Sequence, residues 1–387
     1  MRGSHHHHHH STGRPEAGAH APGKLILSGE HSVLYGAPAL AMAIARYTEV
    51  WFTPLGIGEG IRTTFANLSG GATYSLKLLS GFKSRLDRRF EQFLNGDLKV
   101  HKVLTHPDDL AVYALASLLH DKPPGTAAMP GIGAMHHLPR PGELGSRTEL
   151  PIGAGMGSSA AIVAATTVLF ETLLDRPKTP EQRFDRVRFC ERLKHGKAGP
   201  IDAASVVRGG LVRVGGNGPG SISSFDLPED HDLVAGRGWY WVLHGRPVSG
   251  TGECVSAVAA AHGRDAALWD AFAVCTRALE AALLSGGSPD AAITENQRLL
   301  ERIGVVPAAT QALVAQIEEA GGAAKICGAG SVRGDHGGAV LVRIDDAQAM
   351  ASVMARHPDL DWAPLRMSRT GAAPGPAPRA QPLPGQG

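Results

Sequence analysis

Residues 151–161 read PIGAGMGSSAA and place three glycines, Gly153, Gly155 and Gly157, within five positions. The next residues, 162–175, read IVAATTVLFETLLD, an apolar run that predicts a buried helix over residues 158–174. Glycine is among the residues least favourable to helices. The cluster therefore indicates a special backbone conformation at the entry to the helix.

Such a junction is typical of an anion-binding site. Glycines adopt positive φ angles and let the backbone approach a ligand closely. The first turn of the following helix presents unpaired N–H groups and the positive end of its dipole. Ser158 and Ser159 add hydroxyls that could cap the helix, contact a phosphate oxygen or bind a magnesium ion. A tight strand-to-helix turn without a ligand is the alternative.

Two common phosphate loops are excluded by the spacing. A Walker A loop needs a lysine after its last glycine, and this loop has none. A dinucleotide-binding loop needs Gly-x-Gly-x-x-Gly, and Ser158 stands at the position of the last glycine.

Composition excludes further classes. Residues 1–10, MRGSHHHHHH, are a purification tag. Lys and Arg total 38 against 36 Asp and Glu, and this balance argues against a nucleic-acid binder. We find no apolar run of about 18 residues, so we expect no membrane span. The cysteines show no metal-ligand spacing and indicate reduced, buried thiols in a cytoplasmic protein: Cys190, Cys254, Cys275 and Cys327.

Strand and helix signals are mixed along the chain without strict alternation, which predicts an α+β fold. Thr179 and Pro180 have the pattern of an N-cap and first helical residue. Expected strands are residues 24–28, 48–53, 239–244 and 339–344; expected helices are residues 107–120, 158–174, 179–195, 255–261, 265–285, 308–320 and 347–356.

A shift to Gly, Asn, Pro and Ser at residues 216–221 predicts a domain boundary. We therefore expect an N-terminal domain over residues 20–218 and a C-terminal domain over residues 219–368. Residues 1–19 and the Pro/Gly-rich residues 369–387 are expected to be disordered tails.

Two other segments carry unusual residues. Residues 21–36, APGKLILSGEHSVLYG, place Lys24 in a strand and Glu30 and His31 just after it. Residues 327–338, CGAGSVRGDHGG, form a second glycine cluster before a strand. Taken alone, Lys24 is compatible with a solvated surface lysine, and Glu30 and His31 are compatible with an ordinary turn.

Together and in this order, the three segments resemble the GHMP kinase superfamily, and residues 21–41 (APGKLILSGEHSVLYGAPALA) resemble the mevalonate kinases in particular. The resemblance covers residues 20 to about 345. It implies a two-domain α+β fold with ATP in the N-terminal domain and the active site in the cleft between domains. It also implies transfer of the γ-phosphate of ATP to the 5-hydroxyl of mevalonate, with Mg²⁺, and frequently a homodimer.

The resemblance implies a role for each site residue. Asp202 matches the catalytic aspartate, and Lys24 matches the lysine that contacts the acceptor hydroxyl and the transferring phosphate. Glu191 and Ser159 match the magnesium ligands. Glu30 and His31 match a pair that lies near the acceptor. The ATP loop consists of Gly153, Ala154, Gly155, Met156, Gly157, Ser158 and Ser159.

These residue types suit phosphoryl transfer, which needs in-line placement and stabilisation of charge on the phosphoryl oxygens. Magnesium prefers oxygen ligands, as a carboxylate and a hydroxyl supply. A lysine beside Asp202 would favour its charged form and help the acceptor lose its proton. The residues leave open whether Asp202 takes that proton or mainly holds Lys24 and the hydroxyl.

Two departures from the mevalonate kinase pattern leave the acceptor open. Residues 195–202 read HGKAGPID, where the family usually has His-Gly-Asn-Pro-Ser-Gly-Ile/Val-Asp, and Lys197 is unusual there. Residues 331–336, SVRGDH, extend the second glycine cluster; Arg333 and His336 could contact ATP or belong to a solvated loop. Ser249 and Thr251 match a loop that faces the active site.

Two rival functions follow. One is a kinase for another small alcohol, phosphomevalonate or a sugar. The other is an inactive nucleotide-binding protein, which predicts loss of a charged site residue. Lys24, Glu191 and Asp202 are all present, and this argues against the second rival.

Overall fold

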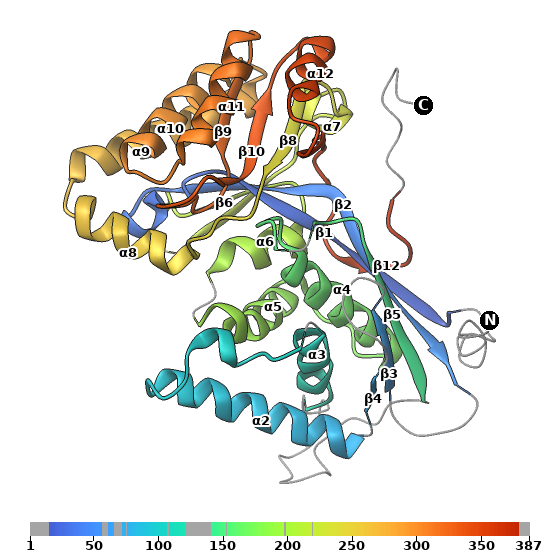
Figure 1. The fold of residues 1–387 in the computed structure, drawn as a ribbon. Coiled ribbons are helices and arrows are strands. Elements are labelled where there is room, and N and C mark those ends of the chain that lie inside the picture. Colours follow the sequence, from blue (N-terminus) through green and yellow to red (C-terminus); the bar gives the residue numbers. More distant parts are fainter. Residues whose placement is uncertain are drawn as a thin grey trace.

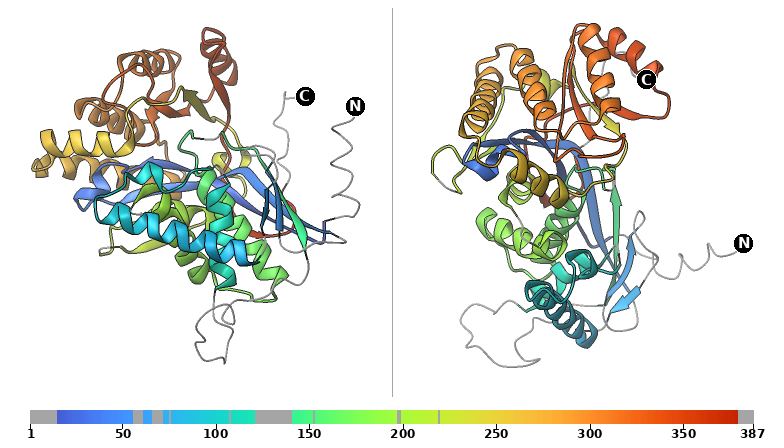
Figure 2. Two further views of the ribbon diagram at one scale, coloured as in Figure 1. Left: turned by 60° about the horizontal axis from the view of Figure 1, so that its bottom comes forward. Right: turned by 60° about the vertical axis from the view of Figure 1, so that its left-hand side comes forward.

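The computed structural model describes residues 15–55, 61–65, 72–74, 76–106, 108–120, 141–151, 153–196, 199–218 and 220–378. These residues form two sheets with helices packed against them (Figure 1; two further views in Figure 2). The α+β class expected from the sequence is confirmed.

The first sheet is built around two long strands, β1 (Ala17–Ser28) and β2 (Ala39–Pro54). Its order is β12-β1-β2-β5-β3-β4, and β6 and β7 continue from β2. All of its pairs are antiparallel except β3 with β5. The remaining strands are β3 (Ile61–Phe65), β4 (Ala72–Tyr74), β5 (Gly142–Thr148), β6 (Leu211–Val214), β7 (Ile222–Phe225) and β12 (Ala373–Pro374).

Helix α4 (Ser158–Leu173) lies against β1 and β2 and forms the centre of the helical layer (Figure 1). Its alanine-rich surface is buried almost all round, because small side chains allow close packing on the sheet and on neighbouring helices. Those neighbours are α3 (Asp109–Leu119), α5 (Pro180–His195) and α6 (Pro200–Arg208), and α2 (Leu76–Leu94) packs outside α3.

The second sheet has four antiparallel strands in the order β11-β8-β10-β9. Its two faces differ along β8 (Trp239–His244): Trp239 and Trp241 join the core of the first sheet, whereas Tyr240 and Val242 join the core under α9–α12. The other elements are β9 (Ala323–Ile326), β10 (Gly338–Arg343), β11 (Asp361–Pro364), α8 (Thr251–His262), α9 (Ala266–Ser285), α10 (Asp290–Arg302), α11 (Ala308–Glu319) and α12 (Ala347–Ala355).

Short elements complete the chain: the 3-10 helices η1 (Ser32–Tyr35) and η2 (Val100–Lys102) and helix α7 (Asp232–Ala235). In the described part of the chain, no helix combines the length and apolarity needed to cross a membrane. All four cysteines are buried free thiols, as expected from their spacing.

Each expected strand and helix overlaps an observed one. The N-cap expected at Thr179 is confirmed by a capping box: Thr179 Oγ1 accepts from Gln182 N at 3.2 Å, and Thr179 N donates to Gln182 Oε1 at 2.9 Å.

The expectation of disordered tails is wrong for the described residues on both sides. Ala17 and Gly18 already pair with β2, and Ala373 and Pro374 pair with β1. Backbone pairing orders these segments even though their small side chains bury little surface. Gly371 allows the returning chain to pass directly over Val207 O, where a Cβ atom would clash. Residues 1–14 and 379–387 lie outside the described part.

The domain boundary expected after residue 218 stays a prediction. Strand β7 follows that position and pairs with β6, so the first sheet extends beyond residue 218.

Candidate active site

The glycine loop joins β5 to α4 through three residues with left-handed backbone. Gly153, Gly155 and Gly157 have φ angles of 74°, 78° and 76°. Side chains are strained at such angles, which explains the cluster. Gly157 is the N-cap of α4 and supplies no side-chain hydrogen bond to the helix. The loop therefore has the backbone conformation of an anion-binding nest at a helix N-terminus.

Lys24 of β1 lies directly against this loop. Its backbone N–H donates to Met156 O at 2.9 Å, and its Nζ donates to Gly155 O at 3.1 Å. A Cβ atom on Gly157 would lie 2.9 Å from Lys24 Cγ, so this glycine makes room for the lysine. The buried side chains of Ala154 and Met156 anchor the loop in the core.

Asp202 is held at the same place by the lysine. Asp202 Oδ1 lies 3.1 Å from Lys24 Nζ, and the aspartate side chain is 31% exposed. Asp202 belongs to the first turn of α6, which begins with Pro200 after the N-cap Gly199. Two residues that are 178 positions apart in the sequence thus form an ion pair beside the glycine loop.

Ser159 and Glu191 form a second contact beside the loop. Ser159 Oγ, on the first turn of α4, lies 3.0 and 3.2 Å from the two carboxylate oxygens of Glu191 on α5. Burial, together with the negative charge of Asp202, raises the pKa of Glu191 to about 7. An ionised Glu191 is therefore costly in this position without a cation.

Glu191, His195 and Asp202 each offer a ligand atom, and these atoms all lie within 4.8 Å of one another. Burial and the nearby Lys194 lower the pKa of His195, so its imidazole is neutral and able to bind a metal. Two carboxylates and the Ser159 hydroxyl are oxygen donors that fit Mg²⁺. These side chains therefore offer suitable ligand atoms, and a divalent cation would offset the buried negative charge of Glu191.

Glu30 and His31 are directed toward the second glycine cluster. Glu30 Oε1 pairs with Lys325 Nζ at 3.3 Å, and both side chains are buried. His31 Nε2 lies 2.9 Å from Ala329 O. Among the described residues, Glu30 Oε2 and His31 Nδ1 have no hydrogen-bond partner although they are buried. Their expected place near an acceptor stays a prediction.

The extension at residues 331–336 makes hydrogen bonds and an ion pair with the segment that follows β8, residues 245–253. Ser331 Oγ and Ser249 Oγ are 2.7 Å apart and buried. Arg333 pairs with Glu253 at 2.9 Å and donates to Val248 O at 3.3 Å. His336 fills the space beside Gly245, where a Cβ atom would clash. The alternatives for Arg333 are a contact with ATP and a place in a solvated loop. Its ion pair with Glu253 lies at the surface and fits the solvated loop.

Arg246 is a residue that sequence reasoning missed. It lies in the segment that follows β8, and a Cβ atom on Gly153 would lie 3.2 Å from Arg246 Cζ. A cation from the second half of the chain thus packs against the glycine loop. A single arginine in a loop carries no sequence signal, because its position depends on how the two sheets meet.

A cavity of about 430 Å³ opens beside the two serines. Ser158 and Ser159 belong to its lining, together with apolar side chains such as Leu104, Leu110 and Ile162. The volume and the apolar walls suit a small organic group. Its other lining residues come from distant parts of the chain: Thr48, Val100, His101, His106, Ser146, Thr148, Leu193 and Lys194.

Comparison with known proteins gives consistent results. Residues 130–210 match the family model of the GHMP kinase N-terminal domain. The chain is 26% identical over 315 residues to mevalonate kinase of Archaeoglobus fulgidus, covering 81% of this chain and 88% of the relative. It is 30% identical over 200 residues to mevalonate kinase of Pyrococcus abyssi, covering 50% of each.

Solved structures share the fold. The mevalonate kinase of Methanococcus jannaschii superposes with a TM-score of 0.68 at 18% identity, over 92% of this chain and 99% of that chain. Lactococcus lactis galactokinase complexed with galactose superposes with a TM-score of 0.63 at 12% identity, over 92% and 94%. The fold expected from the resemblance is thereby confirmed.

Proposed function

The chain carries the N-terminal domain of the GHMP kinases and has their fold, and from this premise we propose that it transfers the γ-phosphate of ATP to the 5-hydroxyl of mevalonate. The observation that carries the proposal is the Lys24–Asp202 ion pair at 3.1 Å beside the glycine loop. The Ser159–Glu191 contact flanks the same loop.

In this proposal the loop N–H groups and the first turn of α4 bind the phosphates. Ser159 and Glu191 would hold Mg²⁺, which neutralises phosphate charge when bound. The raised pKa of Glu191 supports this role, because a bound cation offsets the cost of its buried negative charge. The cavity next to Ser158 would take the base of the nucleotide.

Lys24 and Asp202 act on the acceptor side. Lys24 is 6% exposed and held by Gly155 O, so its charge is fixed in position beside the phosphate-binding loop. Asp202 accepts the proton that the alcohol loses, and Lys24 stabilises the charge on the transferring group. Arg246 adds a positive charge on the Gly153 side of the loop.

Mevalonate is proposed as the acceptor because curated relatives that are 26% identical over 81% of this chain are named mevalonate kinases. Residues 195–202, HGKAGPID, keep the length of the corresponding mevalonate kinase segment but lose its central Pro-Ser-Gly. Lys197 and Ala198 lie outside the described residues. A kinase for another small alcohol, phosphomevalonate or a sugar is the alternative.

The deciding experiment is a coupled ADP-release assay with mevalonate, phosphomevalonate, homoserine and hexoses. We expect turnover with mevalonate to exceed that with the other acceptors. Turnover with a sugar and none with mevalonate would reject the acceptor while leaving the kinase assignment intact.

Asp202→Asn tests the catalytic assignment. We expect kcat to fall by about 10³-fold or more, because general-base and charge effects of this size are typical, while ATP binding stays within about threefold of wild type. Asp226→Asn is the matched control, since Asp226 is a surface aspartate paired with Arg369 at 2.7 Å. Unchanged turnover in Asp202→Asn would refute the role of Asp202.

A further inference from the structure

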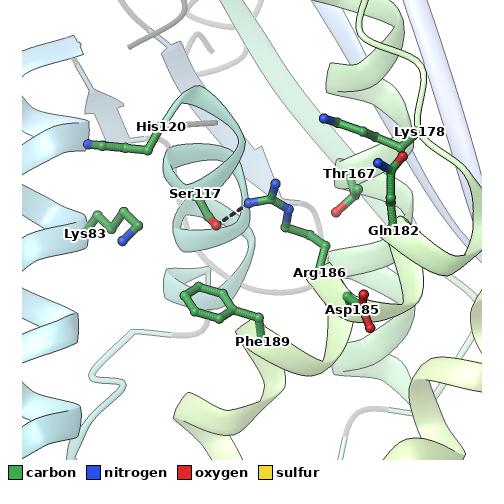
Figure 3. Close-up of a pocket in the computed structure, with 9 residues that line it drawn as sticks. All are labelled: Lys83, Ser117, His120, Thr167, Lys178, Gln182, Asp185, Arg186 and Phe189. Atoms are coloured by element: carbon green, nitrogen blue, oxygen red, sulfur yellow. Dashed lines mark hydrogen bonds between the residues drawn. The ribbon is translucent and has the colours of Figure 1, made fainter. Parts of the chain in front are cut away.

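A cavity of about 700 Å³ lies among α2, α3, α4 and α5, away from the residues assigned above (Figure 3). Its volume is within the range of small-molecule sites. Its lining is polar and includes one aromatic ring: Lys83, Ser117, His120, Thr167, Lys178, Gln182, Asp185, Arg186 and Phe189.

The cavity is separate from the candidate active site although it shares two helices with it. Thr167 follows Ser159 by eight residues on α4, which corresponds to about 12 Å along the helix axis. On α5, Phe189 and Arg186 point about 200° and 140° away from Glu191 around the helix. The cavity and the Ser159–Glu191 contact therefore lie on different sides of α5.

Positive charge gathers at this cavity. Lys83 comes from α2, Lys178 from the segment before α5 and Arg186 from α5 itself, and His120 ends α3. Among the described residues that line the cavity, Asp185 is the carboxylate. The whole chain has nearly equal numbers of cationic and anionic side chains, so this is a local concentration of positive charge.

The polar groups are held in position by neighbouring side chains. Arg186 Nη1 donates to the buried Ser117 Oγ at 2.5 Å, and Figure 3 shows the guanidinium between Ser117 and Thr167 with Lys178 nearby. Lys83 Nζ binds Asp87 at 2.8 Å. Gln182 Oε1 accepts from Thr179 N, which leaves the amide N–H groups of Gln182 as its donors.

One wall of the cavity is aromatic. Phe189 is 39% exposed, an unusual exposure for a phenylalanine, and Lys83 Nζ lies 5.9 Å from the centre of its ring. Arg192 stacks on the ring at 3.8 Å and helps to fix its orientation. A ligand in this cavity would meet a fixed apolar surface next to several hydrogen-bond donors with positive charge.

We propose that this cavity binds a small organic dianion, a phosphate monoester with an apolar or aromatic group. The dianion is bound by Arg186 and Lys178, because guanidinium and ammonium groups suit phosphate oxygens. The apolar group packs against Phe189. This site is independent of the phosphoryl transfer proposed above.

Calorimetric titration of the full chain with phenyl phosphate tests the proposal. Saturating Mg²⁺ and a non-hydrolysable ATP analogue are added first to fill the glycine loop. We expect binding to persist, to be about tenfold weaker for inorganic phosphate, and to be absent for phenol, since both the charge and the ring contribute.

Arg186→Gln and Lys178→Gln should each weaken phenyl phosphate binding by about tenfold. Phe189→Leu should weaken it while leaving inorganic phosphate binding unchanged. Arg188→Gln is the matched control, because Arg188 is on the same helix and does not line the cavity. Thermal unfolding checks that each variant folds; if Arg186→Gln does not fold, Lys178→Gln decides.

Displacement of phenyl phosphate by the ATP analogue would overturn the proposal, because the dianion would then bind at the glycine loop. Absence of binding up to about 10 mM, well above the range of specific small-ligand sites, would also overturn it. Equal binding by wild type and Lys178→Gln has the same consequence.

Discussion

The two glycine clusters have similar composition and use their backbones in opposite ways. Residues 153–157 lead into α4, and a helix N-terminus leaves N–H groups unpaired. Residues 327–338 lead into β10, which pairs with β8 and β9. In the second cluster, Ser331 N donates to Val305 O and Val332 N donates to Ser249 Oγ.

Glycine content alone therefore does not identify a ligand site. The first cluster opens onto a helix N-terminus, whereas in the second cluster the N–H groups of Ser331 and Val332 are bonded within the protein. The first cluster has the properties of a binding loop. The second has those of a structural loop that is held by hydrogen bonds to Val305 and Ser249.

The largest expected difference comes from adding one methyl group to each cluster. Gly157→Ala would place a Cβ atom 2.9 Å from Lys24 Cγ at a φ of 76°. We expect kcat/KM to fall by about 10³-fold, because Lys24 and the loop must shift. Gly334→Ala, also at a φ of 76°, would place a Cβ atom 2.7 Å from Cγ2 of Val248, an exposed side chain to which the candidate site assigns no role.

For Gly334→Ala we expect a loss of about 1–2 kcal/mol in unfolding free energy and a change in kcat/KM below about threefold. Steady-state kinetics and urea unfolding of both variants measure the two effects. Equal losses of activity would show that both clusters serve the reaction.

The carboxylates beside the two clusters also differ: Glu191, beside the first, has a raised pKa, and Glu253, beside the second, has a lowered one. Burial raises the pKa of Glu191 from 4.5 to about 7, whereas the hydrogen bond from Arg333 lowers the pKa of the exposed Glu253. Between pH 4.5 and 7 the folded protein therefore binds a proton at Glu191 that the unfolded chain has released. Stability from this group is present at low pH and is lost as pH rises through about 7.

Without divalent metal, we expect unfolding free energy to fall by up to about 3 kcal/mol from pH 5 to 8 because of Glu191. Urea unfolding in chelator measures this slope, and Glu191→Gln should remove most of it. Glu253→Gln should leave it in place. Mg²⁺ should stabilise wild type more at pH 8 than at pH 6. A Glu191→Gln slope equal to that of wild type would contradict the assignment.

A serine at each cluster sharpens the comparison: Ser159 follows the first cluster, and Ser331 lies within the second. Ser159→Ala removes the hydroxyl that contacts Glu191, and we expect kcat/KM for Mg-ATP to fall by about 10–100-fold with little change in stability. Ser331→Ala removes buried bonds to Ser249 and to Arg333 O, and we expect about 1–3 kcal/mol less stability. Activity loss in Ser331→Ala greater than in Ser159→Ala would reverse the two roles.

The smallest effect is expected at Arg333, whose side chain is 59% exposed. An exposed ion pair contributes little to stability, so Arg333→Ala should change stability little and KM for ATP by less than about threefold. Arg333→Lys is the conservative control. A tenfold rise in KM for ATP in the alanine variant would instead place Arg333 at the nucleotide.

Local signals in the sequence predicted much of this fold. Thr179 and Pro180 start α5 as expected, since capping depends only on neighbouring residues. The alternation in β8 and the apolar run of α4 are likewise local. Helix α6 was not expected from the sequence, although Gly199 and Pro200 suit the N-cap and the first residue of a helix.

The site was predictable where a motif carries it and not where packing creates it. Lys24, Ser159, Glu191 and Asp202 were expected together and lie together. Arg246 and the cavity lined by Phe189 depend on contacts between elements far apart in the sequence. No local pattern encodes such contacts.

The pairing of β12 with β1 has a consequence for biosynthesis. Ala373 and Pro374 pair with His20 and Ala19, more than 350 positions earlier in the sequence, at the outer edge of β1. During translation this part of the edge of β1 remains open until residue 374 has been made, and an uncovered strand edge is a template for association with other chains. Premature termination shortly before residue 373 would therefore yield a chain with most of its core and an exposed edge prone to aggregation.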